Sequence, residues 1–192
     1  MIKVKIFISL IILSLCVFSF SSCSRKNNTT QLVQNYYNQL NQSNYLELSK
    51  LIGDSITISE GDYNMNYSND DYYKHFQWDS VFSPKYEILE LKEIDNKVAI
   101  KVSKICTRIK FLNERPIISK EVIEIKNQKV SKIKNIEMDS DFKLWNSTKN
   151  EMVTWIKKNH PELDGFIYDQ TKTGAQNYLK AMALYKEFKD MN

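Results

Sequence analysis

The segment from Pro84 to Glu137 constrains the fold most, because it reads as four consecutive β-strands joined by short turns. Asp95-Asn96 and Asn127-Gln128 are typical two-residue hairpin turns, and Asn113 to Pro116 forms a longer one. Because two-residue turns cannot connect parallel strands, the sequence predicts an antiparallel meander. The expected strands cover residues 86–94, 97–112, 117–126 and 129–137.

The second of these strands changes its apolar phase partway along. Apolar residues occupy even positions at first and odd positions later, as Val98, Ile100 and Val102 and then Ile105, Ile109 and Phe111 show. Since a one-residue shift sends every later side chain to the other face, we predict a β-bulge near Ser103-Lys104. Such a bulge bends a sheet, and a helix laid across the concave side would enclose a pocket.

The residues before this meander favour helices and one short hairpin. Thr30 to Asn41 has a helical apolar stripe, and Asn44 begins a second helix that we expect Gly53 to end. Residues 55–60 alternate as a strand, with a weaker strand at 63–67. Ser68 caps a third helix, which ends before Pro84.

The residues after 139 predict a helical pair. Asp141 can cap a helix whose apolar stripe includes Trp145, Met152 and Trp155. A last helix is expected over about residues 173–189. The two form an αα-hairpin, and we expect their apolar faces to pack on each other and on one side of the sheet.

The first 22 residues have the three parts of an export signal. Lys3 and Lys5 give a positive start, a nearly apolar run spans 6–20, and two serines precede Cys23. A transmembrane anchor is the alternative, but the run is short for a span of about 20 residues. We therefore expect removal of residues 1–22, with ordinary secretion as a further alternative.

The segment Phe20-Ser21-Ser22-Cys23 resembles a bacterial lipobox. The resemblance implies cleavage before Cys23 and lipidation, including palmitate, on its sulfur. Residues 23–30 would then form a polar tether. The expected location is extracytoplasmic, anchored by lipid in the cell membrane or the outer membrane, with the membrane itself as a partner.

Cysteine and charge patterns exclude several classes of site. If Cys23 is lipidated and Cys16 is removed, Cys106 is the only free thiol, and we expect it to be buried. No zinc-type spacing and no glycine-rich phosphate loop occur, so we assign no metal and no cofactor. Residues 97–134 carry eleven Lys/Arg against three Glu, which indicates solvated strand faces or contact with an anionic membrane rather than nucleic acid.

Aromatic side chains are the main candidates for a pocket lining. The candidates are Tyr36, Tyr37, Tyr67, Tyr73 and Trp78, which could point polar tips inward around a small apolar ligand. Plain core packing is the simpler interpretation of such stripes.

Asp71 and His75 are the one candidate acid–base pair, because residues four apart on a helix can touch. In the simpler interpretation Asp71 caps the helix and His75 is exposed. His160 precedes Pro161 at a helix end, where a structural role is expected. No residue is assigned as catalytic.

The order of elements resembles the nuclear transport factor 2-like superfamily, which includes SnoaL-like proteins. The segments Phe76–Phe82 and Pro84-Lys85-Tyr86 are similar to lipoproteins of Bacteroidetes-type bacteria, and His160–Gly165 is similar to a segment appended in them. The resemblance implies an α+β fold, a cone-like curved antiparallel sheet packed on N-terminal helices, over residues 31–139. Residues 140–192 would be the C-terminal extension, the αα-hairpin.

Three functions remain open at this point, since the superfamily contains both enzymes and inactive proteins. The first is a non-catalytic, lipid-anchored cell-envelope protein that binds a ligand or a partner. The second is an isomerase-, dehydratase- or cyclase-like enzyme that uses an acid or a His inside the cone. The third is an assembly module that forms a homodimer through the sheet face, because apolar residues occur on both faces of Ile117–Ile125.

Overall fold

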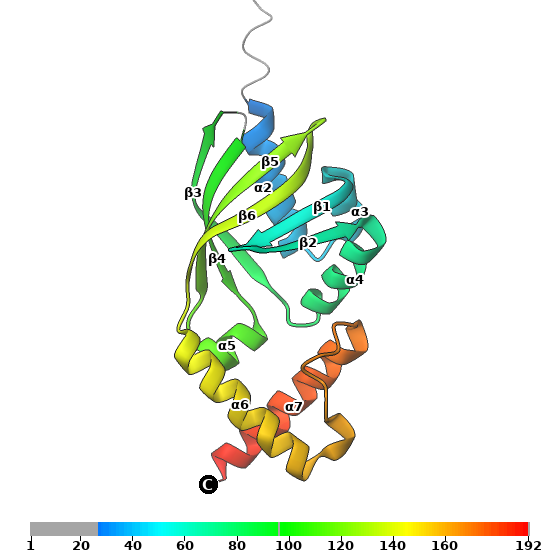
Figure 1. The fold of residues 1–192 in the computed structure, drawn as a ribbon, viewed down its shortest axis with the longest axis vertical. Helices are drawn as coiled ribbons and strands as arrows, with labels where there is room; N and C mark the ends of the chain where they lie inside the picture. The colour runs from blue at the N-terminus through cyan, green and yellow to red at the C-terminus, as the bar shows by residue number, and fades with distance from the viewer. Residues whose placement is uncertain (1–26, 96, 192) are drawn as a thin grey trace, which may run out of the picture.

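The computed structural model describes residues 27–95 and 97–191 (Figure 1). The predicted signal peptide, Cys23 and the tether up to residue 26 lie outside the described residues. Within the described ranges, no helix has both the length and the hydropathy needed to span a membrane.

One curved six-stranded sheet forms the upper part of the molecule (Figure 1). The strands are β1 (Ile52–Glu60), β2 (Tyr63–Ser68), β3 (Lys85–Ile94), β4 (Lys97–Ile105), β5 (Ile117–Lys126) and β6 (Lys129–Asp139), in the order β2-β1-β6-β5-β4-β3. The predicted antiparallel meander of β3 to β6 is confirmed. The whole sheet is mixed, however, because the meander returns β6 to a position beside β1, where the two strands run parallel.

Three N-terminal helices cover one face of this sheet: α2 (Asn27–Asn41), α3 (Tyr45–Leu51) and α4 (Asn69–Ser80). Both predicted caps are confirmed. The Asn44 side chain accepts from the backbone N–H of Glu47 at 3.2 Å, and Ser68 Oγ accepts from that of Asp71 at 3.2 Å. The apolar core between helices and sheet includes Val33, Leu48, Ile56, Ile100 and Ile123, none more than 4% exposed.

The predicted strand over 97–112 is wrong in its second half. β4 ends at Ile105, and residues 107–113 form the short helix α5 (Thr107–Asn113), which Cys106 caps. The apolar phase changes because the period changes from two to 3.6: Ile109 and Leu112 lie three apart and are both buried. The predicted bulge at Ser103-Lys104 is therefore absent, since both residues pair regularly with β5.

The sheet is nevertheless bent by bulges elsewhere. Extra residues interrupt the pairing at Leu89 in β3 and at Ser131 and Ile136 in β6. Leu89 and Ile136 are 42% and 57% exposed, so these bulges leave apolar side chains outside the core. Each bulge bends its strand and increases the local twist, which produces the concave side that the sequence predicted.

Two turn predictions have different outcomes. Asn127 and Gln128 have φ values of 51° and 59°, as a two-residue hairpin turn with two left-handed residues requires. Gly53, in contrast, does not end α3. The helix stops at Leu51, its cap Ile52 is extended, and Gly53 lies inside β1.

The C-terminal helices α6 (Phe142–Asn159) and α7 (Lys172–Asp190) form the predicted hairpin, joined through a 3₁₀ turn, η2 (Pro161–Leu163). They pack on each other and around α5 and Phe82, below the end of the sheet (Figure 1). The expectation that they cover one side of the sheet is therefore wrong. They build a second core, in which Cys106 is buried as a free thiol, as predicted.

The other face of the sheet carries cross-strand ion pairs. Lys97 pairs with Glu124 at 2.8 Å, and Lys120 pairs with Glu137 at 2.6 Å. The predicted homodimer through this face stays a prediction, which the mass of the chain in solution would test.

Candidate functional site

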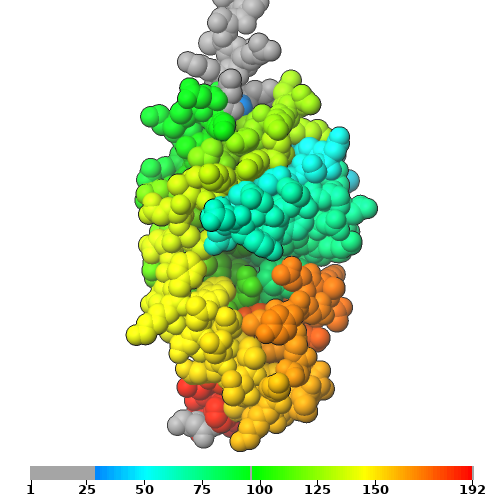
Figure 2. Space-filling view, in the orientation of Figure 1, coloured from blue at the N-terminus to red at the C-terminus, as the bar shows by residue number. Residues whose placement is uncertain are grey.

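A cavity of about 460 Å³ lies between the concave face of the sheet and the helices α2, α4, α5 and the start of α6. Figure 2 shows a hollow in the surface where β2, the β6–α6 segment and the loop before α7 meet. Its apolar walls include Val102, Ile109, Ile117, Ile133 and Met138. Polar side chains from α2, α4, α5 and all the strands except β2 converge on the same space, which makes this cavity the candidate site.

A buried ion pair lies at one side of the cavity. Lys104 Nζ lies 2.9 Å from each carboxylate oxygen of Asp79, and the hydroxyl of Tyr86 donates to Asp79 at 3.1 Å. Burial alone would raise the pKa of Asp79, but attraction to Lys104 outweighs it and holds that pKa below its usual range. Asp79 is thus a fixed anion, neutralised within the protein.

Glu121 is a second carboxylate in the cavity, in a different state. The hydroxyls of Tyr37 and Ser119 donate to it at 2.5 Å and 2.6 Å. Burial raises the pKa of Glu121, and the two hydrogen bonds offset only part of this rise. A buried carboxyl with a raised pKa, beside a tyrosine donor, is a candidate for proton transfer.

His75 on α4 also lines the cavity. Its ring lies 5.3 Å from the Tyr67 ring and 6.1 Å from the Trp78 ring, centroid to centroid. Burial is the main effect on its pKa and lowers it, while the Asp79 charge works in the opposite direction. His75 is therefore a neutral imidazole at pH 7.

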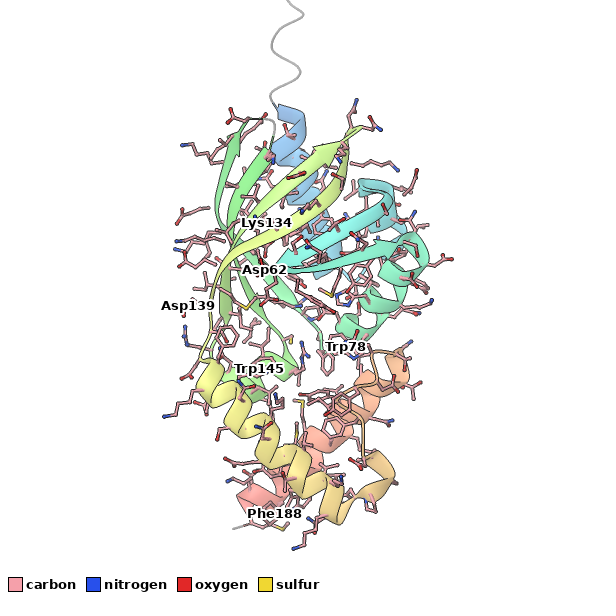
Figure 3. The ribbon with its side chains drawn as sticks, viewed as in Figure 1. Asp62, Trp78, Lys134, Asp139, Trp145 and Phe188 are labelled. Atoms are coloured by element: carbon pink, nitrogen blue, oxygen red, sulfur yellow. The ribbon has the colours of Figure 1, made fainter. Side chains whose placement is uncertain are left out.

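Arg108 on α5 lies at the end of the cavity nearest the C-terminal hairpin. Its guanidinium carbon is 4.6 Å from the centre of the Trp78 ring and 5.5 Å from that of Trp145. In Figure 3 these two tryptophans, from α4 and α6, lie on either side of the region below Asp62. Asn113 fixes this junction, because its side-chain oxygen accepts from the backbone N–H of Asp141 at 2.9 Å.

The structure divides the five predicted aromatic candidates. Tyr36 and Tyr37 line the cavity, and the Tyr36 hydroxyl is hydrogen-bonded to that of Tyr72. Tyr67 and Trp78 lie behind the lining, against His75, and Tyr73 is 43% exposed.

Asp71 and His75, the predicted acid–base pair, form no hydrogen bond with each other. The Asp71 carboxylate accepts from Ser68 Oγ at 2.8 Å and from Lys74 Nζ at 2.9 Å, as a cap residue does. The carboxylate that influences His75 is Asp79, one helical turn later on the same face.

The polar lining residues that sequence reasoning missed include Tyr72, Asp79, Tyr86, Lys104, Arg108 and Glu121. A signal existed for two of them. Lys104 continues the inward series of Val98, Ile100 and Val102, and Glu121 lies two residues before the buried Ile123. A charged residue at an inward strand position, in a chain that folds, points to a polar cavity.

No family model matches the chain, and no curated protein matches it by sequence. Solved structures do resemble it. A nuclear transport factor 2-like protein of unknown function from Cytophaga hutchinsonii is 14% identical, with a TM-score of 0.47 over 58% of this chain and 89% of its own. A de novo designed protein with a curved β-sheet is 16% identical, with a TM-score of 0.48 over 65% and 94%.

The epoxide hydrolase/cyclase-like enzyme SalBIII, of pyran ring formation in the polyether salinomycin, is 13% identical, with a TM-score of 0.50 over 62% of this chain and 95% of its own. At such identities the likeness concerns the fold alone. The structure is therefore an α+β fold with a curved, unclosed sheet on N-terminal helices, similar in fold to SalBIII and extended by a C-terminal helical pair.

Proposed function

We propose that this chain binds a small molecule with a largely apolar body in the cavity of its cone. The observation that carries the proposal is one space of about 460 Å³ whose walls are aliphatic at Val102, Ile109 and Ile133 and polar at Glu121 and Arg108. Ligand pockets in proteins have this size and this mixture of surfaces.

A neutral fluorescent probe, N-phenyl-1-naphthylamine, tests the proposal on the chain from residue 23 with Cys23→Ser, which carries no lipid. Saturable fluorescence enhancement is expected. Ile117→Trp, which directs a larger ring into the cavity, should reduce it. Leu46→Trp is the matched control, because Leu46 is 70% exposed and far from the lining residues. Equal binding by both variants would show that the probe binds elsewhere.

Proton transfer on the bound molecule is the second candidate function, as in an isomerase, dehydratase or cyclase. Glu121 favours it, because this carboxyl has a raised pKa and touches the Tyr37 hydroxyl inside the cavity. The carboxyl would remove a proton from the ligand, and the tyrosine hydroxyl would stabilise the charge that develops. The likeness in fold to the epoxide hydrolase/cyclase-like enzyme SalBIII supports this candidate.

The side-chain carboxyl carbon of Glu121, followed by ¹³C NMR during a pH titration, tests this candidate. We expect its pKa to lie above the usual range. Tyr37→Phe removes a hydrogen bond to the charged form and should raise the pKa further. Tyr73→Phe, at an exposed position, should leave it unchanged. A Glu121 pKa at the value of a free side chain would contradict the assignment.

We also propose that the chain is a lipoprotein of the cell envelope, anchored through Cys23. The support is the apolar run ending in Phe20-Ser21-Ser22-Cys23. The wild-type chain should incorporate a labelled fatty acid and sediment with membranes, and Cys23→Ala should do neither. Labelling that survives Cys23→Ala would exclude this anchor.

A further inference from the structure

Arg108 is a cation without a direct ion-pair partner among the residues that the structure describes. It forms no ion pair and donates no hydrogen bond to any group in residues 27–95 and 97–191, and its Nε is buried without an acceptor. The other cation of the lining, Lys104, is bound to both oxygens of Asp79. A guanidinium carries five N–H donors, and burying them unsatisfied is costly.

Aromatic rings hold the Arg108 side chain in place but supply no hydrogen-bond acceptor for its N–H groups. Its guanidinium carbon lies within 4.6–6.0 Å of the centres of four rings, those of Trp78, Phe82, Trp145 and Tyr178. The faces of aromatic rings attract a cation. They do not accept conventional hydrogen bonds from the N–H groups, which lie in the plane of the guanidinium. The side chain is thus oriented by packing at the cavity wall, where its N–H groups have no acceptor among the described residues.

The carboxylates of the lining cannot supply the missing acceptor. Asp79 is occupied by Lys104 and Tyr86, and Glu121 is occupied by Tyr37 and Ser119. Glu60, the remaining acidic residue of the lining, is exposed at the end of β1. Arg108 is therefore a local positive charge at one end of a partly apolar cavity, which favours an anion from outside at that end.

We propose that the ligand carries an anionic group, a carboxylate, sulfonate or phosphate, that binds the guanidinium of Arg108. This inference rests on the proposed binding function and adds the ligand's chemical class: an apolar acid. Its body lies against the aliphatic walls at Ile109 and Ile133, and its acidic group lies at Arg108, beside Trp145 of the lining. Guanidinium and such anions match in bidentate geometry, which makes Arg108 the determinant of ligand charge.

Two probes of nearly the same shape separate charge from packing. 1-Anilinonaphthalene-8-sulfonate carries a sulfonate, and N-phenyl-1-naphthylamine is the same skeleton without it. With the unlipidated chain, Arg108→Gln should weaken sulfonate binding about 10- to 100-fold, the value of a hydrogen bond to a charged group. It should change binding of the neutral probe less than about twofold. Arg115→Gln, at the exposed arginine paired with Asp139, should change neither.

Other outcomes would contradict either the role of Arg108 or the proposed binding function. Unchanged sulfonate affinity in Arg108→Gln, or equal losses for both probes, would overturn the role of Arg108 as the anion site. Failure of both probes to bind the wild-type chain would overturn the proposed binding function itself, and the inference with it. If Arg108→Gln loses its near-ultraviolet circular dichroism, two other measurements decide. Arg108→Lys keeps the charge but not the bidentate donors, so it should lose part of the sulfonate affinity and keep that for the neutral probe. Added salt should weaken binding of the sulfonate only.

Discussion

Asp79→Asn should lower the free energy of unfolding by about 3 kcal/mol, because it leaves Lys104 as an uncompensated charge. The side chains of Lys104 and Asp79 are only 26% and 12% exposed, so water replaces little of the lost interaction. The Tyr86 hydroxyl also loses its charged acceptor. Urea denaturation at neutral pH measures the change.

The same ion pair gives this effect a defined pH dependence. The pKa of Asp79 is lower in the folded chain than its ordinary value of 3.8. Its contribution to stability is therefore complete above that ordinary value and is lost as pH falls through the folded pKa. The difference between wild type and Asp79→Asn should shrink accordingly in acid.

Asp139→Asn is the matched control for Asp79→Asn. Asp139 pairs with Arg115 at 2.9 Å, but the two side chains are 60% and 48% exposed. Solvent screens such a pair, and the expected loss is below about 1 kcal/mol. Equal losses for the two variants would contradict the buried ion pair.

Phe82→Ala should cost about 3–5 kcal/mol, the usual range for truncating a fully buried phenylalanine. Phe82 is 0% exposed. It follows α4, so it lies within the segment that builds the cone. Its ring nevertheless packs edge-on against Tyr178 of α7 at 5.6 Å, centroid to centroid, and against Trp78 at 5.1 Å. The backbone oxygen of Phe82 also accepts from the N–H of Thr107 at 2.9 Å.

Phe82 therefore connects the end of α4 to the second core, which α5 and the C-terminal hairpin build, and its loss should weaken all three together. Urea denaturation followed by tryptophan fluorescence should shift to lower urea as one transition. Phe142→Ala, at a residue that is 52% exposed, should lose less than about 1 kcal/mol. A loss below 1 kcal/mol in Phe82→Ala would show that the hairpin is held by other contacts.

Local signals explain what the sequence could predict. Asn44, Ser68 and Asp141 cap helices through their own side chains, and Asn127-Gln128 sets a hairpin turn, so neighbouring residues alone determine these features. The meander follows from such turns. The β4–α5 boundary was missed because apolar residues at 105 and 109 fit either a strand or a helix when read alone.

The site was harder to predict because its groups come together only in the folded chain. Asp79 and Lys104 are 25 residues apart, and Tyr37 and Glu121 are 84 apart. The inward positions of Lys104 and Glu121 could be read from strand alternation, but their partners could not. Arg108 was assigned to a strand, so its place between two tryptophans required the helix α5 and the hairpin.

The central claim is that the cone interior is the binding site, and methyl NMR with N-phenyl-1-naphthylamine tests it most directly. The account predicts shift changes at the cavity methyl groups of Val102, Ile109 and Ile133. Changes confined to Thr154 and the Trp155 indole, in the shallow groove between α6 and α7, would contradict it, as would no change at all.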